Sequence, residues 1–261
     1  MAQKDRLDQI RTTVREKERV VVSELSKQFQ VTEETIRRDL EKLEAEGLVT
    51  RTFGGAILNG RNTSARTSYA QRTQMNVAEK KTIARIAAGL IPKHRCVIGA
   101  DSSSTVFETI CLLKGQSNLL LMTYAANILQ ELVDADMRIM STGGLFNKES
   151  HSFMGVITRN TIKAYNTDIL LISCKGLSLD GGLFDSDENE ADIKQLMATK
   201  AAKIILLADH SKFDSVAFAK LMDLESVDVL VTDRRPSEAW VDVLAAANVQ
   251  LLCPEMIDKV Q

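Results

Sequence analysis

The sequence lacks the features that mark membrane, secreted and metal-bound proteins. No stretch approaches the roughly 20 apolar residues that cross a bilayer, and the opening residues, MAQKDRLDQI, lack the apolar core of a secretory signal. The four cysteines, Cys96, Cys111, Cys174 and Cys253, form no CxxC pair and no His/Cys cluster. We therefore expect a cytoplasmic chain with reduced thiols that contacts no membrane and holds no metal, disulfide framework or cofactor.

The sequence also lacks a positive balance of charge and the common nucleotide-binding motifs. The net charge is -2, so a nucleic-acid partner would have to be bound by locally placed side chains rather than by a broadly basic surface. Neither GxGxxG nor GxxxxGK[ST] occurs, which disfavours a dinucleotide or a nucleoside triphosphate as ligand. The chain has 261 residues, 44% of them hydrophobic and 26% charged. This is an ordinary globular composition, and the length allows a small domain followed by a medium one.

The stretch from Val31 to Ala56 predicts a helix followed by a hairpin. One apolar stripe at helical spacing is formed by Ile36, Leu40 and Leu43. Thr32 is expected to cap the start of this helix, and Gly47 to end it in a left-handed conformation. A strand over residues 48–53 is then broken by two glycines and resumes at Ala56.

The preceding residues complete a recognisable order of elements. Apolar spacing predicts a first helix from Lys4 to Val14, and Val20-Val21-Val22 predicts a short strand. Ser23 is placed to cap the next helix, over residues 24–29. Helix, short strand, helix, tight turn, helix and hairpin is the order of a winged helix-turn-helix.

The last of these helices carries side chains that suit the DNA major groove. With the apolar stripe inward, Thr35, Arg37, Arg38 and Lys42 point elsewhere. An arginine fork can bind a guanine edge, and a hydroxyl can reach a base or a phosphate. The alternative is an ordinary amphipathic helix with a solvated charged face.

The segment TIRRDLEKLEAEGLVTRTFGGA closely resembles the signature of the DeoR family of bacterial sugar-metabolism regulators, over about residues 6–56. Phe53 departs from it, because the family often has histidine at this position, but Arg51 is still able to reach a phosphate. The resemblance implies contacts with double-stranded DNA. The predicted DNA-binding residues are Ser23, Thr32, Thr35, Arg37, Arg38, Lys42 and Arg51.

The domain division follows from a polar segment after the hairpin. Residues 59–74, NGRNTSARTSYAQRTQ, lack a hydrophobic period. We expect a DNA-binding domain over residues 1–58, a linker over 59–76 and a second domain over 77–261. The linker arginines, Arg61, Arg66 and Arg72, are interpreted as solvated.

In the second domain, short apolar strands alternate with helices. This alternation predicts an α/β doubly wound domain with a mainly parallel sheet covered on both faces. Ligands of such sheets bind outside the carboxyl ends of the strands. Asp101 to Thr105 follow the first strand and open a helix, where hydroxyls and free N–H groups suit an anion. The alternative for this loop is an ordinary helix cap.

Polar residues also follow the other strands, and together they predict a site for a small polyhydroxy anion. Lys175 and Lys212 supply positive charge, Gly143-Gly144 permits close backbone approach, and Asp185, Glu188 and Glu190, expected in a loop before a helix, could hold sugar hydroxyls. The predicted effector-binding residues are Asp101, Ser102, Ser103, Ser104, Thr105, Thr123, Gly143, Gly144, Lys175, Gly176, Asp185, Glu190 and Lys212.

This half is similar to the sensor domain of the same family, over about residues 77–253, through DSSST, STGG, GLFDSDENE and LADHSKF. The resemblance implies a fold like ribose-5-phosphate isomerase and coenzyme A transferases, with Asp101 to Thr105 around a phosphoryl group or its neighbouring hydroxyls and Lys212 helping to neutralise it. The family often has small residues or Thr-Gly at Cys174-Lys175. Our hypothesis is that Lys175 adds affinity for a strongly anionic sugar, a phosphate or a sulfonate.

Three functions remain open from the sequence. The first is a repressor of a carbohydrate catabolic operon, released from a palindromic or repeated operator by an anionic sugar and acting as a homodimer or homotetramer. The second is a sugar-phosphate isomerase or deaminase, for which Asp101, Glu190 or His210 could supply an acid or base. The third is an architectural DNA-binding protein. The resemblance favours the first, with no catalytic residues.

Overall fold

A computed structural model describes residues 3–17, 19–45, 49–52, 54–58, 68–179 and 182–257. The chain divides into two compact units, residues 1–65 and 66–261. No helix of the described residues is long and apolar enough to cross a membrane. The two units are described separately below.

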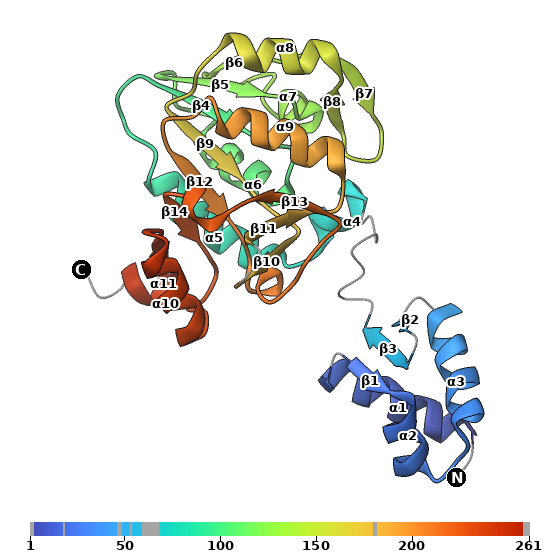
Figure 1. Cartoon of the computed structure of the whole chain (residues 1–261). Helices are drawn as coiled ribbons and strands as arrows, with labels where there is room; N and C mark the ends of the chain where they lie inside the picture. The colour runs from blue at the N-terminus through green and yellow to red at the C-terminus, as the bar shows by residue number, and fades with distance from the viewer. Residues whose placement is uncertain are drawn as a thin grey trace. The chain divides into compact units, whose positions relative to one another are not determined.

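The first unit is a winged helix-turn-helix, as the element order predicts (Figure 1). Its elements are α1 (Gln3–Lys17), β1 (Arg19–Val21), α2 (Val22–Phe29), α3 (Glu33–Ala45), β2 (Val49–Thr52) and β3 (Gly55–Leu58). The strands form an antiparallel sheet in the order β1-β3-β2. A side chain at Gly55 would collide with the Val20 carbonyl oxygen, so the close approach of β1 to β3 requires glycine there.

The apolar stripes of the three helices meet in one core. Ile36, Leu40 and Leu43 of α3 are at most 1% exposed, and they pack with residues of α1, α2 and the sheet. A buried ion pair between Arg6 Nε and Asp39 Oδ2, 2.6 Å apart, joins α1 to α3. The core therefore fixes which face of α3 is turned away from the unit.

The caps of this unit agree with the sequence in one place and differ in another. The Thr35 N–H donates to Thr32 Oγ1 at 3.3 Å, so Thr32 caps α3 as predicted. Helix α2 instead begins at Val22, and the residue before it gives no side-chain cap. Ser23 is thus an exposed residue inside the first turn and not a cap. Gly47 and Phe53 lie outside the described residues.

The second unit is built on a seven-stranded parallel sheet, which confirms the predicted α/β fold. In spatial order, the strands are β15 (Gln250–Leu252), β14 (Val229–Val231), β12 (Ile204–Leu207), β9 (Ile169–Ile172), β4 (Cys96–Ala100), β5 (Leu119–Thr123) and β6 (Arg138–Ser141). Their continuous apolar runs are explained by burial on both faces. In β9, for example, Leu171 belongs to one core and Leu170 and Ile172 to the other.

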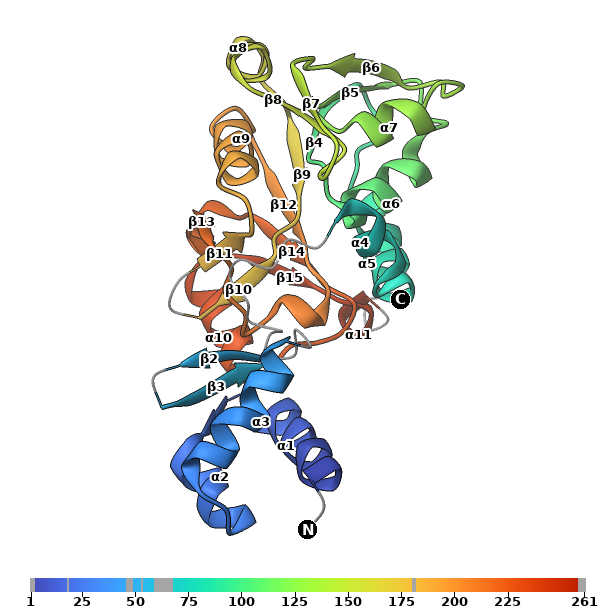
Figure 2. The ribbon, with the colours of Figure 1, turned by 90° about the vertical axis from the view of Figure 1, so that its right-hand side faces the viewer.

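Helices cover both faces of this sheet (Figure 2). On one face lie α5 (Val77–Gly89), α6 (Ser104–Leu113) and α7 (Ala126–Glu131). On the other lie α8 (Val156–Ala164), α9 (Glu188–Ala198) and α10 (Glu238–Ala246). A short α11 (Pro254–Ile257) follows the last strand.

The sequence did not predict the smaller β elements. A hairpin of β7 (Leu145–Asn147) and β8 (Ser152–Met154) precedes α8. A second, antiparallel sheet is formed by β10 (Gly176–Ser178), β11 (Gly182–Asp185) and β13 (Ala219–Met222). Asp185 therefore ends a strand, while Glu188 and Glu190 lie in the first turn of α9, instead of all three lying in a loop.

Part of the predicted linker belongs to the second unit. Residues 69–74 form helix α4 (Tyr69–Gln74), and a reciprocal capping box joins Ser68 to Gln71. The Tyr69 ring stacks on His151 with centroids 5.2 Å apart, and its hydroxyl accepts a hydrogen bond from Asn127 Nδ2 at 2.6 Å. Arg72 is half-buried rather than solvated, whereas Arg61 and Arg66 lie outside the described residues.

Candidate functional site

The loop between β4 and α6 is fixed from within by the carboxylate of Asp101. This side chain is 0% exposed. Its Oδ1 accepts the Ser103 N–H at 2.8 Å, and its Oδ2 accepts the Ser173 N–H at 2.9 Å. The sequence predicts that Asp101 faces a ligand, but the structure places it behind the loop with both oxygens engaged. Its contacts hold the end of β4 to the end of β9.

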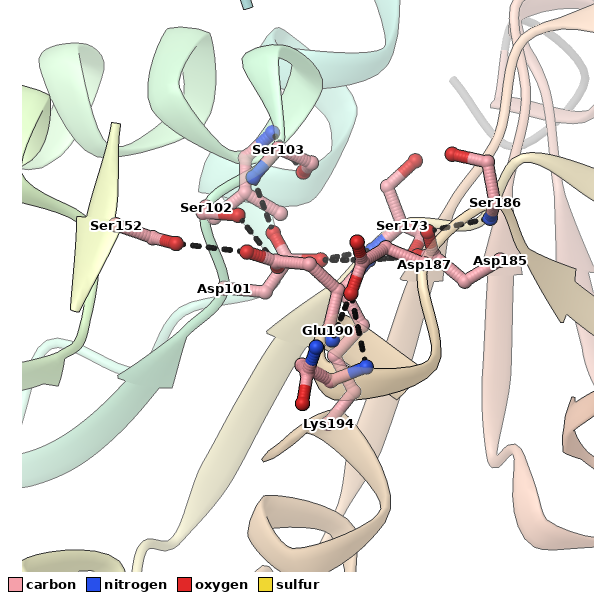
Figure 3. Close-up of polar contacts among 12 residues, drawn as sticks. Asp101, Ser102, Ser103, Ser152, Ser173, Asp185, Ser186, Asp187, Glu190 and Lys194 are labelled. Atoms are coloured by element: carbon pink, nitrogen blue, oxygen red, sulfur yellow. Dashed lines mark hydrogen bonds and ion pairs between the residues drawn. The ribbon is translucent and has the colours of Figure 1, made fainter. Parts of the chain in front are cut away.

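Lys194 of α9 lies buried between two carboxylates (Figure 3). Its Nζ is 3.1 Å from Asp101 Oδ2 and 2.8 Å from Asp185 Oδ2, and it donates to the Ser173 carbonyl oxygen at 2.8 Å. Burial opposes the positive charge, but Asp101 and Asp185 outweigh it and raise the pKa of Lys194. Lys194 in turn opposes the effect of burial on Asp185 and lowers the pKa of that carboxyl. The three groups form one charged, hydrogen-bonded cluster.

Glu190, also on α9, gathers hydroxyl groups from three other segments. Its Oε2 accepts hydrogen bonds from Ser102 Oγ at 2.8 Å and from the Tyr124 hydroxyl at 2.9 Å. Its Oε1 accepts one from Ser152 Oγ at 2.7 Å (Figure 3). The α9 start itself is capped by Asp187, whose Oδ1 accepts the Asn189 and Glu190 N–H groups. Glu190 is thereby held at a fixed place in the wall of a cavity.

That cavity has a volume of about 340 Å³. Of the predicted effector-binding residues, Ser102, Lys175, Asp185 and Glu190 line it. A smaller cavity of about 70 Å³ lies at the start of α6. The predicted residues that line this second cavity are Ser103, Ser104, Thr105, Lys175 and Lys212. Lys175, Lys194 and Arg72 border both cavities, so the two are neighbouring compartments of one site.

The smaller compartment is rich in positive charge. Its wall includes five basic residues, Arg72, Lys80, Lys175, Lys194 and Lys212, against one acidic residue, Asp209. Burial and the nearby charge of Arg72 lower the pKa of Lys175 to about 7. Burial likewise lowers the pKa of Lys80. The N-terminus of α6 adds the positive end of its dipole, so this compartment suits an anion.

Four other predicted effector residues have structural contacts instead of lining either cavity. Thr123 is fully buried and donates to the Ala100 carbonyl oxygen at 2.8 Å. Gly143 and Gly144 have φ of 62° and 124° in the turn from β6 to β7, where a Gly144 side chain would collide with Thr158. A side chain at Gly176 would collide with the Ser215 carbonyl oxygen. These residues shape the fold around the site.

Sequence reasoning missed Arg72, Lys80 and Lys194. The sequence places Arg72 in the linker, although Ser68-x-x-Gln71 is a readable capping signal for the helix that carries it. Lys80 and Lys194 lie within helical patterns whose charged residues are usually solvated. Nothing in the local sequence distinguishes these two lysines from exposed ones.

The predicted DNA-binding residues of α3 lie on its outward face. The Arg37 and Arg38 side chains are 48% and 72% exposed, and Lys42 is exposed as well. Arg37 Nη2 is 2.9 Å from Glu33 Oε2, and Arg38 Nε is 3.5 Å from Glu34 Oε1. Exposed ion pairs of this kind contribute only about 0.3–0.5 kcal/mol to the stability of the fold. Both arginines can therefore leave their glutamates at little cost in free energy.

The other predicted DNA-binding residues are Thr32, Ser23 and Arg51, which lie outside the exposed charged face of α3. Thr32 is exposed, and its hydroxyl lies 2.9 Å from that of Thr35. Ser23 is exposed on α2. Arg51 belongs to β2, but its side chain lies outside the described residues.

Both units match models of known domain families. Residues 6–62 match the DeoR-like helix-turn-helix domain, and residues 75–234 match the DeoR C terminal sensor domain. The chain is 30% identical over 251 residues to a putative aga operon transcriptional repressor of Escherichia coli O157:H7, covering 95% of this chain and 93% of that protein. It is 31% identical over 255 residues to the glycerol-3-phosphate regulon repressor of Escherichia coli K12, covering 97% and 100%.

A solved structure, ribose 5-phosphate isomerase A from Neisseria gonorrhoeae, is similar to part of the chain. The TM-score is 0.39 and the identity 15%, covering 58% of this chain and 56% of that one. The family matches and the two repressors confirm the predicted resemblance. They favour a transcriptional regulator over an isomerase or deaminase.

Proposed function

The chain belongs to the DeoR family of transcriptional regulators, and on that premise we propose that it represses a carbohydrate catabolic operon until a phosphorylated or otherwise anionic sugar fills the paired cavities. The observation that carries this proposal is the pairing itself. A small, strongly basic compartment opens beside a larger one lined by hydroxyl and carboxylate groups.

Each compartment suits one end of such an effector. The phosphoryl group occupies the smaller compartment, where Lys212 and the first N–H groups of α6 bind its oxygens. The sugar hydroxyls occupy the larger compartment and donate to Glu190 and Asp185. Its volume of about 340 Å³ lies within the range of about 300–1,000 Å³ found for small-molecule sites.

On the DNA side, α3 enters the major groove of the operator. Thr35, Arg37, Arg38 and Lys42 contact bases and phosphates, with Ser23, Thr32 and Arg51 on the flanking backbone. One small head offers few contacts, so the protein acts as a homodimer or homotetramer on a palindromic or repeated operator. It works in the cytoplasm, where its DNA is found and its four free cysteines stay reduced.

Release requires that the effector bind the DNA-incompetent state more tightly than the DNA-bound state, because a ligand with equal affinity for both would shift nothing. The test is fluorescence anisotropy of the full-length protein on DNA from upstream of its own coding region. Scrambled DNA serves as competitor, and the panel contains glycerol 3-phosphate, ribose 5-phosphate, glucose 6-phosphate and a sulfonated sugar.

We expect binding that survives the competitor and is lost with one member of the panel. Binding that falls steeply with salt and equals that to scrambled DNA would mean that this fragment holds no operator. Specific binding that no anionic sugar alters would count against the effector half of the proposal.

A further inference from the structure

We propose that Arg72 binds the anionic group of the effector directly, and that through this contact the occupancy of the cavities determines how firmly helix α4 is held on the second unit. The proposal rests on the function proposed above. It adds the residue that connects the effector to the segment leading back to the DNA-binding unit.

Arg72 lies where the two cavities meet. Arg72 borders both the larger and the smaller cavity, and it belongs to α4, the first described element after the helix-turn-helix unit. Its guanidinium carbon lies 5.4 Å from the centre of the Tyr69 ring, which supports one face of the group. A planar guanidinium held in this way presents its N–H groups as a fork suited to a phosphate or carboxylate.

Arg72 also carries an unsatisfied hydrogen-bond donor. The Nε of Arg72 is shielded from solvent, yet it has no hydrogen-bond partner among the described residues. A buried donor without a partner is costly, because it loses its hydrogen bonds to water and gains none in return. An effector oxygen at the junction of the two cavities would supply the partner.

The charges around Arg72 favour an anion in the smaller cavity. Arg72 shares the smaller cavity with Lys80, Lys175 and Lys212, and its charge is one reason for the lowered pKa of Lys175. These cations repel one another. A bound phosphate would attract each of them and offset this repulsion, and its attraction for Arg72 would hold α4 more firmly at the site.

Hydrogen bonds attach the C-terminal end of α4, and the residues after it, to the second unit. The ammonium group of Lys80 donates to the carbonyl oxygens of Arg72 and of Met75, the latter at 2.5 Å. Asn76 Nδ2 donates to Asp209 Oδ1 at 3.0 Å and to Ser211 Oγ at 3.1 Å, next to Lys212. Asn76, which directly precedes α5, therefore ties the segment after α4 to the same loop that supplies Lys212, a predicted phosphate ligand.

The N-terminal end of α4 is connected in sequence to the helix-turn-helix unit. Ser68, its cap, borders the larger cavity, and the residues before it in sequence lead to the helix-turn-helix unit. Figure 2 shows α4 beside α5 and α6, and it packs on α6. The helix has only six residues, so a contact between Arg72 and a bound effector would add to the few contacts that hold it.

The test uses the full-length protein with Arg72→Gln, which removes the charge, and Arg72→Lys, which keeps the charge but not the fork. Arg85→Gln, on the exposed face of α5, is the matched control. Titration calorimetry measures the affinity for glycerol 3-phosphate, ribose 5-phosphate, glucose 6-phosphate and inorganic phosphate. Hydrogen exchange measures the protection of amides 69–74 with and without the same compounds.

We expect Arg72→Gln to weaken binding of the panel member preferred by the wild type by about tenfold to a hundredfold, the loss of a charge-assisted hydrogen bond. The affinity of Arg72→Lys should lie between those of the wild type and Arg72→Gln, and Arg85→Gln should bind like the wild type. Protection of α4 should rise on binding in the wild type but not in Arg72→Gln. Thermal melting without ligand shows that each variant is folded; if Arg72→Gln is not, Arg72→Lys decides by the same criteria.

Wild-type affinity and wild-type protection of α4 in the Arg72 variants would overturn the inference and leave the proposed function standing. A wild-type protein that binds no compound of the panel and is released from DNA by none would overturn both.

Discussion

On α3 of the first unit, Arg37 and Arg38 pair with glutamates one turn earlier and stay exposed, whereas Lys194 of the second unit lies 4% exposed between Asp101 and Asp185. The exposed pairs are weak and easily exchanged, which the proposed DNA-reading surface needs. The buried pairs were removed from water at a high cost and are stable only while every partner is present. Ion pairs thus remain easy to break where they are exposed in one unit, and hold side chains in fixed positions where they are buried in the other.

The largest effect should come from breaking the buried cluster. Lys194→Met leaves Asp101 and Asp185 buried without their cation, which should lower the free energy of unfolding of the second unit by about 3–5 kcal/mol. Denaturant unfolding followed by circular dichroism measures this loss. The control is Lys203→Met at an exposed position, which should change stability by no more than about 0.5 kcal/mol. Equal stability of the two variants would mean that the buried cluster contributes nothing.

A change on the exposed helix should affect binding and leave stability almost unaltered. Arg38→Ala should cost about 1–3 kcal/mol of operator affinity and relax the preference at one base pair if Arg38 reads a base. Anisotropy on the operator and on single-base variants measures both effects. If Arg38 touches only phosphate, all the sequences should lose affinity alike. Lys27→Ala, an exposed change on α2, is the control for a general loss of positive charge.

The partly buried Lys175 stands between these two extremes and should make effector binding depend on pH. Its pKa is lowered to about 7 by burial first and then by Arg72, and a bound anion favours the protonated form. Affinity for glucose 6-phosphate or another bound sugar phosphate should therefore fall about tenfold between pH 6 and pH 8. In Lys175→Met this dependence should disappear, apart from the titration of the phosphate itself. A Lys175→Met protein with wild-type affinity at pH 6 would refute the role of this lysine.

The contribution of Lys175 to stability should depend on pH in the opposite direction, rising as the pH rises. The unfolded chain protonates Lys175 up to its ordinary pKa of 10.5, whereas the folded protein releases the proton near pH 7. Between these values the unfolded state binds more protons, so the contribution of Lys175 to stability rises with pH. Below pH 7 the lysine is protonated in both states, and there it destabilises the folded protein most. Comparing the melting of wild type and Lys175→Met from pH 6 to pH 9 measures this difference.

The sequence predicted the elements whose pattern is local and strong. The stripe of Ile36, Leu40 and Leu43 located α3, and continuous apolar runs located the strands of the parallel sheet. Strands β10, β11 and β13 were missed because each has only three or four residues without a marked apolar run. The sequence also predicted that polar residues from several strand-end loops gather at one place, because the carboxyl ends of parallel strands meet at the same edge of the sheet. The direction of Asp101 was not predictable, because its partner Ser173 lies 72 residues away in sequence.

The smallest expected effect is the contribution of an exposed pair to the stability of the first unit. In a double-mutant cycle of Glu33→Gln and Arg37→Gln, the coupling free energy should be about 0.3–0.5 kcal/mol and should vanish at high salt, because the pair is about half exposed. The matched measurement is the cycle of Arg6→Met and Asp39→Asn, whose side chains are 9% and 1% exposed and lie 2.6 Å apart. That coupling should be several times larger and should persist in salt. Similar values for the two cycles would remove the distinction between exchangeable and positioning pairs within this unit, since burial is the property that separates them.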